Sequence, residues 1–145
     1  MVAFEKKLEI RWSDLDPNHH VRHSLYYDYG AYSRISFLNE NGITPELMLQ
    51  HSIGPILFRV ECKFKREIKF GDEMMINLKL DKAKADMSRW TMIHELWKNT
   101  DTIAAVITVD GAWIDTSLRK LTKPPEIFKA AFEHIPRTER FEFNV

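Results

Sequence analysis

Five segments of the chain alternate apolar and polar residues, and this period of two predicts β-strands that each bury one face. They lie at residues 4–12, 56–65, 74–80, 90–96 and 103–113. Short polar turns join the last four segments, which favours antiparallel pairing between strands that follow one another. The pattern therefore predicts one antiparallel sheet of five strands.

Between the first two strands, residues 24–41 follow a helical pattern. Ser24 suits the N-cap and Gly42 the left-handed residue after the helix end. Gly30 lies inside this helix, where glycine costs about 1 kcal/mol relative to alanine, so we expect it to allow close packing on the sheet. Shorter helices are predicted after Thr44 and Pro125. One long helix against an antiparallel sheet is an α+β architecture.

Composition sets limits on the class of protein. The 145 residues suit a single domain covering 1–145, with 44% hydrophobic and 29% charged residues as in soluble globular proteins. Lys+Arg and Asp+Glu are 21 each, so no basic excess indicates nucleic-acid binding. Cys62 is the only cysteine and is predicted to be a buried, inert thiol. Neither a signal peptide nor a membrane-spanning run is evident, which predicts a cytoplasmic protein without membrane contact.

The loop before the long helix holds the candidate chemistry. A carboxylate near a helix N-terminus, where free N–H groups polarise a carbonyl, suits acyl chemistry, and Asp16 has that place. From the residues alone, Asp14 and Asp16 can equally well cap turns. His19, His20 and His23 do not suggest a metal site, because Pro17-Asn18 opposes the helix that would align them and no other ligand cluster is present. We expect no metal and no cofactor.

The same loop and helix resemble a known family. The order Asp14-x-Asp16-x-x-His19-His20-Val21, followed by Tyr26, Tyr29 and Arg34, is similar to the signature of hotdog-fold acyl-CoA thioesterases of the 4-hydroxybenzoyl-CoA thioesterase branch. The resemblance extends from about Phe4 to Ala131. It implies a five-stranded antiparallel sheet wrapped around one long helix. His19 replaces the family's glycine, and Arg22-His23 replaces its asparagine pair.

The resemblance implies roles for several residues. Asp16 matches the catalytic carboxylate, as nucleophile or general base, and His20 matches a histidine that can orient it. The N–H groups from His23 through Ser24 to Leu25 are expected to hold the thioester oxygen. Expected substrate contacts are Tyr26 and Tyr29 for the acyl group, and Lys63, Arg66 and Arg89 for the CoA phosphates, with Lys65, Lys82 and Lys84 as further candidates. The alternative is that the tyrosines are core and the cations solvated strand faces.

The predicted function is hydrolysis of an acyl-CoA to a carboxylic acid and CoA. Two alternatives remain open: an enoyl-thioester hydratase that pairs Asp16 with His20, and a non-catalytic acyl-thioester-binding protein, suggested by His19. One helix covers only one face of such a sheet and the edge strands need partners, so we expect a homodimer or homotetramer with the acyl site at the subunit boundary. The expected partner is acyl-CoA, with no nucleic acid and no membrane.

Overall fold

The computed structural model describes residues 3–144. Its helices are α1 (Leu25–Glu40), α2 (Pro45–Gln50) and α3 (Glu126–Glu133), with a 3-10 turn at Trp12–Asp14. Its strands are β1 (Glu5–Leu8), β2 (Ile53–Phe64), β3 (Met74–Asn77), β4 (Lys79–Lys84), β5 (Arg89–Lys98), β6 (Thr102–Asp115), β7 (Lys120–Leu121) and β8 (Arg137–Asn144).

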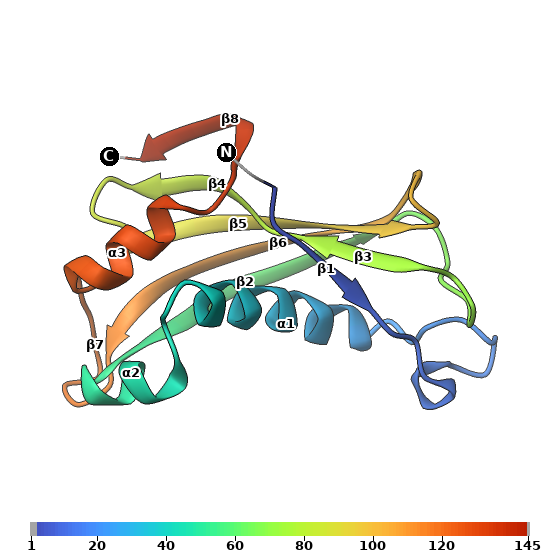
Figure 1. Cartoon of the computed structure of the whole chain (residues 1–145), viewed down its shortest axis with the longest axis horizontal. Coiled ribbons are helices and arrows are strands. Elements are labelled where there is room, and N and C mark those ends of the chain that lie inside the picture. The colour runs from blue at the N-terminus through green and yellow to red at the C-terminus, as the bar shows by residue number, and fades with distance from the viewer. Residues whose placement is uncertain (1–2, 145) are drawn as a thin grey trace.

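All the strands belong to one curved sheet (Figure 1). β2 pairs with β6 and β6 with β5, while β3 and β4 lie one after the other along the second edge of β5. β1 flanks β3 and β8 flanks β4; every pairing is antiparallel except β4 with β8. The predicted α+β fold is confirmed. The sheet has eight strands rather than five because the third predicted strand is interrupted at Leu78 and because β7 and β8 are added.

The charged C-terminal segment forms the edge strand β8. Its anchor is the buried carboxylate of Asp81 on β4. Arg140 donates to both carboxylate oxygens, from Nε at 2.9 Å and Nη2 at 3.0 Å, and Thr138 Oγ1 donates at 2.8 Å. These bonds fasten β8 beside β4. Val145 lies outside the described residues.

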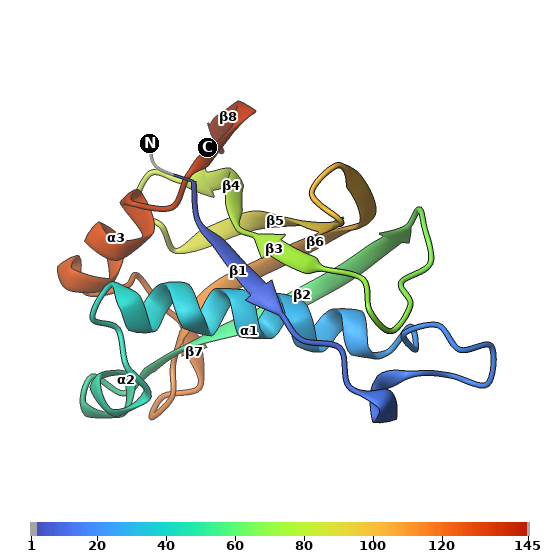
Figure 2. The ribbon, with the colours of Figure 1, turned by 45° about the vertical axis from the view of Figure 1, so that its right-hand side comes forward.

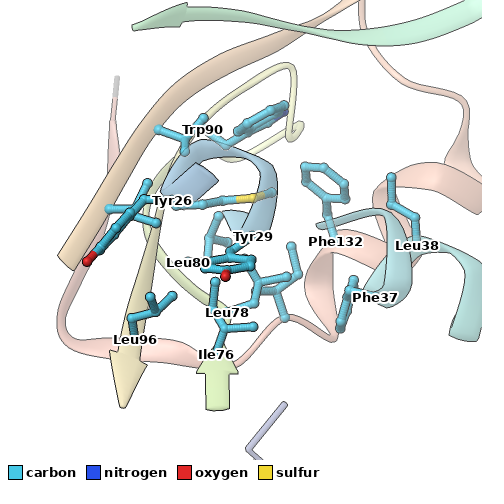
Figure 3. Close-up of a cluster of buried hydrophobic side chains, with 14 of the residues drawn as sticks. Tyr26, Tyr29, Phe37, Leu38, Ile76, Leu78, Leu80, Trp90, Leu96 and Phe132 are labelled. Atoms are coloured by element: carbon cyan, nitrogen blue, oxygen red, sulfur yellow. The ribbon is translucent and has the colours of Figure 1, made fainter. Parts of the chain in front are cut away.

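Helix α1 lies across the concave side of the sheet (Figures 1 and 2). Its buried side includes Tyr26, Gly30, Ser33 and Phe37, which are three or four residues apart and so share one helix face. A Cβ on Gly30 would lie only 3.1 Å from Arg34 Nη1 and 3.5 Å from the His94 ring of β5, so close packing onto the sheet is confirmed. Figure 3 shows Tyr26 and Tyr29 of α1 among the buried side chains of the core, whereas Tyr27 and Tyr32 are exposed.

The helix boundaries follow the sequence signals, with one correction. Gly42 has a φ of +81°, as expected after a helix end. Ser24 is at the N-cap position, but its backbone is already helical, with φ −65° and ψ −25°, and its side chain caps nothing. The prediction that Ser24 caps the helix was wrong for that reason. Thr44 does cap α2, by accepting from Leu47 N at 3.1 Å.

Cys62 is half-buried on β2 rather than fully buried. Burial raises the pKa of its thiol to about 11, so the group stays protonated and unreactive at neutral pH, in line with the prediction of an inert cysteine. Within residues 3–144, no helix combines the length and apolar composition that a membrane span requires.

Candidate active site

The loop before α1 is a short hairpin at one end of the molecule (Figure 1). Leu15 bridges Val21, Asp16 N donates to His20 O at 2.7 Å, and His19 N donates to Asp16 O at 2.9 Å. In such three-residue hairpins, the residue after the turn adopts the left-handed conformation that favours glycine. His19 is in that position, with a φ of +64°. The loop therefore keeps a backbone shape suited to glycine although it carries histidine.

Asp16 both holds this hairpin and keeps one oxygen available. Its Oδ1 accepts from Asn18 N at 2.8 Å and from His20 N at 3.2 Å. Its Oδ2 accepts no hydrogen bond from any residue that the structure describes. The two readings of this aspartate are thus compatible, because one oxygen caps the turn and the other is left for chemistry. The bond from His20 comes from its backbone, and its ring makes none to Asp16 within residues 3–144.

Asp14, two residues earlier, is fully engaged. Only 2% of it is exposed, and it accepts from Arg11 N at 2.8 Å and from Arg11 Nη2 at 3.0 Å. Burial on its own raises the pKa of Asp14, but the bonds from Arg11 and the nearby Arg22 outweigh burial and hold the pKa below its usual value. Asp14 is therefore a structural carboxylate.

The first turn of α1 begins just behind the hairpin. Leu25 N donates to Arg22 O at 3.1 Å and Tyr26 N donates to His23 O at 3.3 Å. The N–H groups of His23 and Ser24 have no hydrogen-bond partner in the described part of the chain. Of the three N–H groups expected to hold a carbonyl oxygen, Leu25 is thus already occupied and the other two are available.

An open pocket of about 320 Å³ lies beside Asp16. Its lining combines two carboxylates, two histidines, two cations and an aromatic wall: Asp16, His20, Val21, His23, Tyr26, Phe64, Lys65, Arg66 and Glu67. Six of the predicted site residues meet here, namely Asp16, His20, His23, Tyr26, Lys65 and Arg66. Burial, followed by the charges of Cys62, Asp16 and Glu67, raises the pKa of Tyr26 to about 12, so its hydroxyl remains a donor.

The other predicted substrate contacts do not line this pocket. Ser24 precedes the first residue of α1, and Tyr29 is buried next to Tyr26, with ring centroids 6.3 Å apart. Lys63 is exposed on β2, next to the lining residue Phe64. Arg89 lies on Phe58, with its guanidinium carbon 5.1 Å from the ring centroid.

Arg89 is at the far end of the sheet from Asp16. It is in register with Ala112 of β6, whereas the pocket residue Phe64 is in register with Ala105. Seven strand positions correspond to roughly 23 Å at about 3.3 Å per residue. Within one chain, Arg89 therefore cannot contact a group held at Asp16.

Sequence reasoning missed Glu67 and Phe64. Phe64 packs edge-on against Tyr26, with ring centroids 4.9 Å apart. A hydrogen bond from its own backbone and the charge of His20 lower the pKa of Glu67. The only sequence signal was position: both residues lie where β2 ends, and that end meets the hairpin through the bridge from His20 to Lys69.

The histidines of the loop do not form a metal site in the described residues. Across residues 3–144, no group of three or more His, Cys, Asp or Glu side chains is close enough to share an ion.

Comparison with solved structures shows which proteins share this fold. A hypothetical protein from Staphylococcus aureus, solved in complex with CoA, is 18% identical and matches with a TM-score of 0.86 over 94% of this chain and 87% of its own. A 1,4-dihydroxy-2-naphthoyl-CoA thioesterase from Synechocystis is 16% identical, with a TM-score of 0.81 over 92% of this chain and 97% of its own. A DHNA-CoA thioesterase from Staphylococcus aureus is 14% identical, with a TM-score of 0.81 over 92% and 90%.

These likenesses confirm the hotdog fold that the resemblance implies. A search of curated protein sequences finds no match. The sequence model of the Thioesterase-like superfamily matches residues 10–132, a range that includes the hairpin, α1 and most of the sheet. The predicted class of thioester hydrolase is thereby confirmed: the chain belongs to the thioesterase-like superfamily.

Proposed function

We propose that this protein hydrolyses acyl-CoA thioesters to a carboxylic acid and free CoA, and that Asp16 carries the reaction. The observation that supports this most is that Asp16, with its unbonded Oδ2, lines the same pocket as His23, and that the N–H groups of His23 and Ser24 have no partner in the described residues. Membership of the thioesterase-like superfamily and the CoA-related names of similar structures support the substrate class.

In this proposal, the N–H groups at the start of α1 hold the thioester oxygen as negative charge develops on it. Asp16 then acts in one of two ways. As a nucleophile it attacks the carbonyl carbon, CoA leaves as thiolate, and water hydrolyses the resulting anhydride. As a general base it removes a proton from the water that attacks the carbon. Both routes consume one water and end in acid and free thiol.

The cations of the pocket suit the phosphates of CoA. Lys65 and Arg66 line the pocket beside Asp16, and the exposed Lys63 is close by on β2. We propose that these three residues position the phosphates, and that Arg89 contributes only from a second subunit, because its own Asp16 is too distant.

The free edge of β2 supports a dimer. Across the described residues, β2 pairs with β6 alone, so the other edge of this 12-residue strand is unpaired. Leu57, Phe58 and Phe64 on this strand are 43%, 53% and 52% exposed. A long, apolar, unpaired edge is a site of association. We propose that two copies pair at β2, with a tetramer as the alternative; a strictly monomeric, fully active species in sedimentation at micromolar protein would refute this assembly.

The function and its residue are tested by Asp16→Asn. The amide preserves the shape and the turn-capping acceptor but is neither a base nor a useful nucleophile, so turnover of octanoyl-CoA should fall about a hundredfold or more. Asp28→Asn is the matched control, because it removes an exposed carboxylate from the first turn of the same helix. Equal turnover in the wild-type protein and Asp16→Asn would remove Asp16 from the mechanism.

A further inference from the structure

A second pocket lies under the middle of α1, away from Asp16. It has a volume of about 220 Å³ and is enclosed by α1, the start of β2, β5 and α3. Its walls are almost wholly apolar and include Leu38, Leu57, Trp90, Met92 and Phe132. Figure 3 labels several of these side chains around the interior of the fold. Arg34 is the one charged residue of the lining.

Arg34 has no anionic partner. Its Nη1 lies 3.0 Å from His94 Nε2, and it forms no ion pair with any carboxylate in the described part of the chain. Burial lowers the pKa of Arg34 to about 10, so the guanidinium is still charged at neutral pH. Arg34 is half-buried, and a cation partly removed from water without an anion is costly, so proteins usually pair such groups.

His94 holds the guanidinium in place without neutralising it. The His94 ring is fully buried, and its Nδ1 lies 2.8 Å from the carbonyl oxygen of Asn77, which can only accept. Nδ1 therefore carries the proton and Nε2 accepts from Arg34. His94 is therefore a core histidine with both ring nitrogens hydrogen-bonded. The absence of a side chain at Gly30 leaves the space that the Arg34 side chain occupies.

We propose that this pocket binds an apolar monocarboxylate of medium length, with its carboxylate on the Arg34 guanidinium and its chain against the apolar walls. The guanidinium offers a planar set of donors that matches a carboxylate, and only one of its nitrogens is used by His94. A methylene group is about the size of a water molecule, ~30 Å³, so the pocket volume corresponds to roughly seven such groups. Octanoate has this size and charge.

The pocket is separate from the candidate active site. The two linings share no residue, and Arg34 lies eight residues beyond Tyr26, about 12 Å along the helix axis. Binding of a free acid at Arg34 therefore does not depend on thioester hydrolysis, and it can be measured without turnover.

The test is calorimetric titration of the whole protein with octanoate and with 1-octanol, which has the same chain length but no charge. We expect wild-type protein to bind octanoate at least about tenfold more tightly than octanol, as a charge-assisted hydrogen-bonded pair predicts. Arg34→Met should remove this preference while octanol binding stays within about twofold, which also reports an intact pocket. Arg34→Lys should restore part of the preference.

A second variant makes the test independent of Arg34. Ala31 is exposed at the rim of the pocket, and Ala31→Phe should fill the entrance and weaken the binding of both ligands. Asp16→Asn serves as the control and should bind octanoate like the wild type. The proposal is overturned if wild-type protein shows no preference for octanoate, if Ala31→Phe binds it unchanged, or if Asp16→Asn abolishes its binding.

Discussion

Helix α1 borders two pockets, and each contains a charged side chain. One pocket is open and polar, and the other is apolar. At its start, Asp16 lies in an open pocket among other charged and polar groups, with one oxygen bonded and one free. In its middle, Arg34 lines an apolar pocket, and within residues 3–144 its side chain forms a hydrogen bond with His94 alone. We propose that the first setting supplies a reactive carboxylate and N–H donors in a pocket open to water. The second supplies a fixed cation and apolar walls, which suits binding and not reaction.

The contrast arises from what surrounds each group and not from the residue types. Asp14 and Asp16 are two residues apart. Asp14 accepts hydrogen bonds from Arg11, whereas Asp16 lines an open pocket. Similarly, His20 borders the open pocket while His94 is fully enclosed.

The largest expected effect on stability concerns His94. Burial, then the charge of Arg34, lowers the pKa of His94 from 6.5 to about 3, so between these values the unfolded chain binds more protons than the folded protein. The free energy of unfolding should therefore fall by about 2 kcal/mol between pH 7.5 and 5. Urea unfolding across this range measures the slope.

A variant tests whether His94 causes this pH dependence of the free energy of unfolding. His94→Gln, although less stable overall, should lose most of the slope, whereas His134→Gln, which alters an exposed histidine after α3, should keep it. If the free energy of unfolding of His94→Gln depends on pH as in the wild type, His94 is not kept neutral by its burial.

The next effect separates the two aspartates of the hairpin. Asp14→Asn removes a buried carboxylate that accepts several bonds from Arg11, and should lower the free energy of unfolding by about 2 kcal/mol. Asp16→Asn should change it by less than about 0.5 kcal/mol, because an amide oxygen can still cap the turn. Both are measured by urea unfolding at neutral pH. Equal losses would contradict the distinction between a structural and an available carboxylate.

The smallest effect concerns His19. Its left-handed backbone favours glycine, so His19→Gly should raise the free energy of unfolding by about 1 kcal/mol. Trp12 is the only aromatic ring beside it in the described residues, with centroids 6.4 Å apart. A thermal unfolding scan of the two proteins checks this. A lower stability of His19→Gly would mean that the contacts of the His19 side chain stabilise the fold by more than its left-handed backbone destabilises it.

The sequence predicts well whatever depends on local periodicity. The alternating strands, the buried side of α1 and the left-handed Gly42 all follow from spacing and backbone preference. The sequence does not predict β8, because the pairing of this strand depends on the bonds from Arg140 to Asp81. Nothing in the local sequence distinguishes Asp81 from other polar strand residues.

The candidate site was predictable in part, through its family pattern. Asp16, His20 and Tyr26 belong to one local segment, so a motif is enough to find them. Glu67 joins them only because β2 ends beside the hairpin, a contact made across the fold. Arg34 fits a helical pattern in which arginine is usually solvated. Its burial appears only once His94 and the sheet lie against α1.

The central claim is that the open pocket at the start of α1 hydrolyses a thioester. The most direct measurement is the release of free thiol when wild-type protein meets a short panel of acyl-CoA substrates, including octanoyl-CoA and an enoyl-CoA. We predict thiol release that saturates with substrate and is lost in Asp16→Asn. Addition of water to the enoyl-CoA without thiol release would indicate a hydratase, and saturable binding without turnover a binding protein. Either result would show that this pocket does not hydrolyse thioesters.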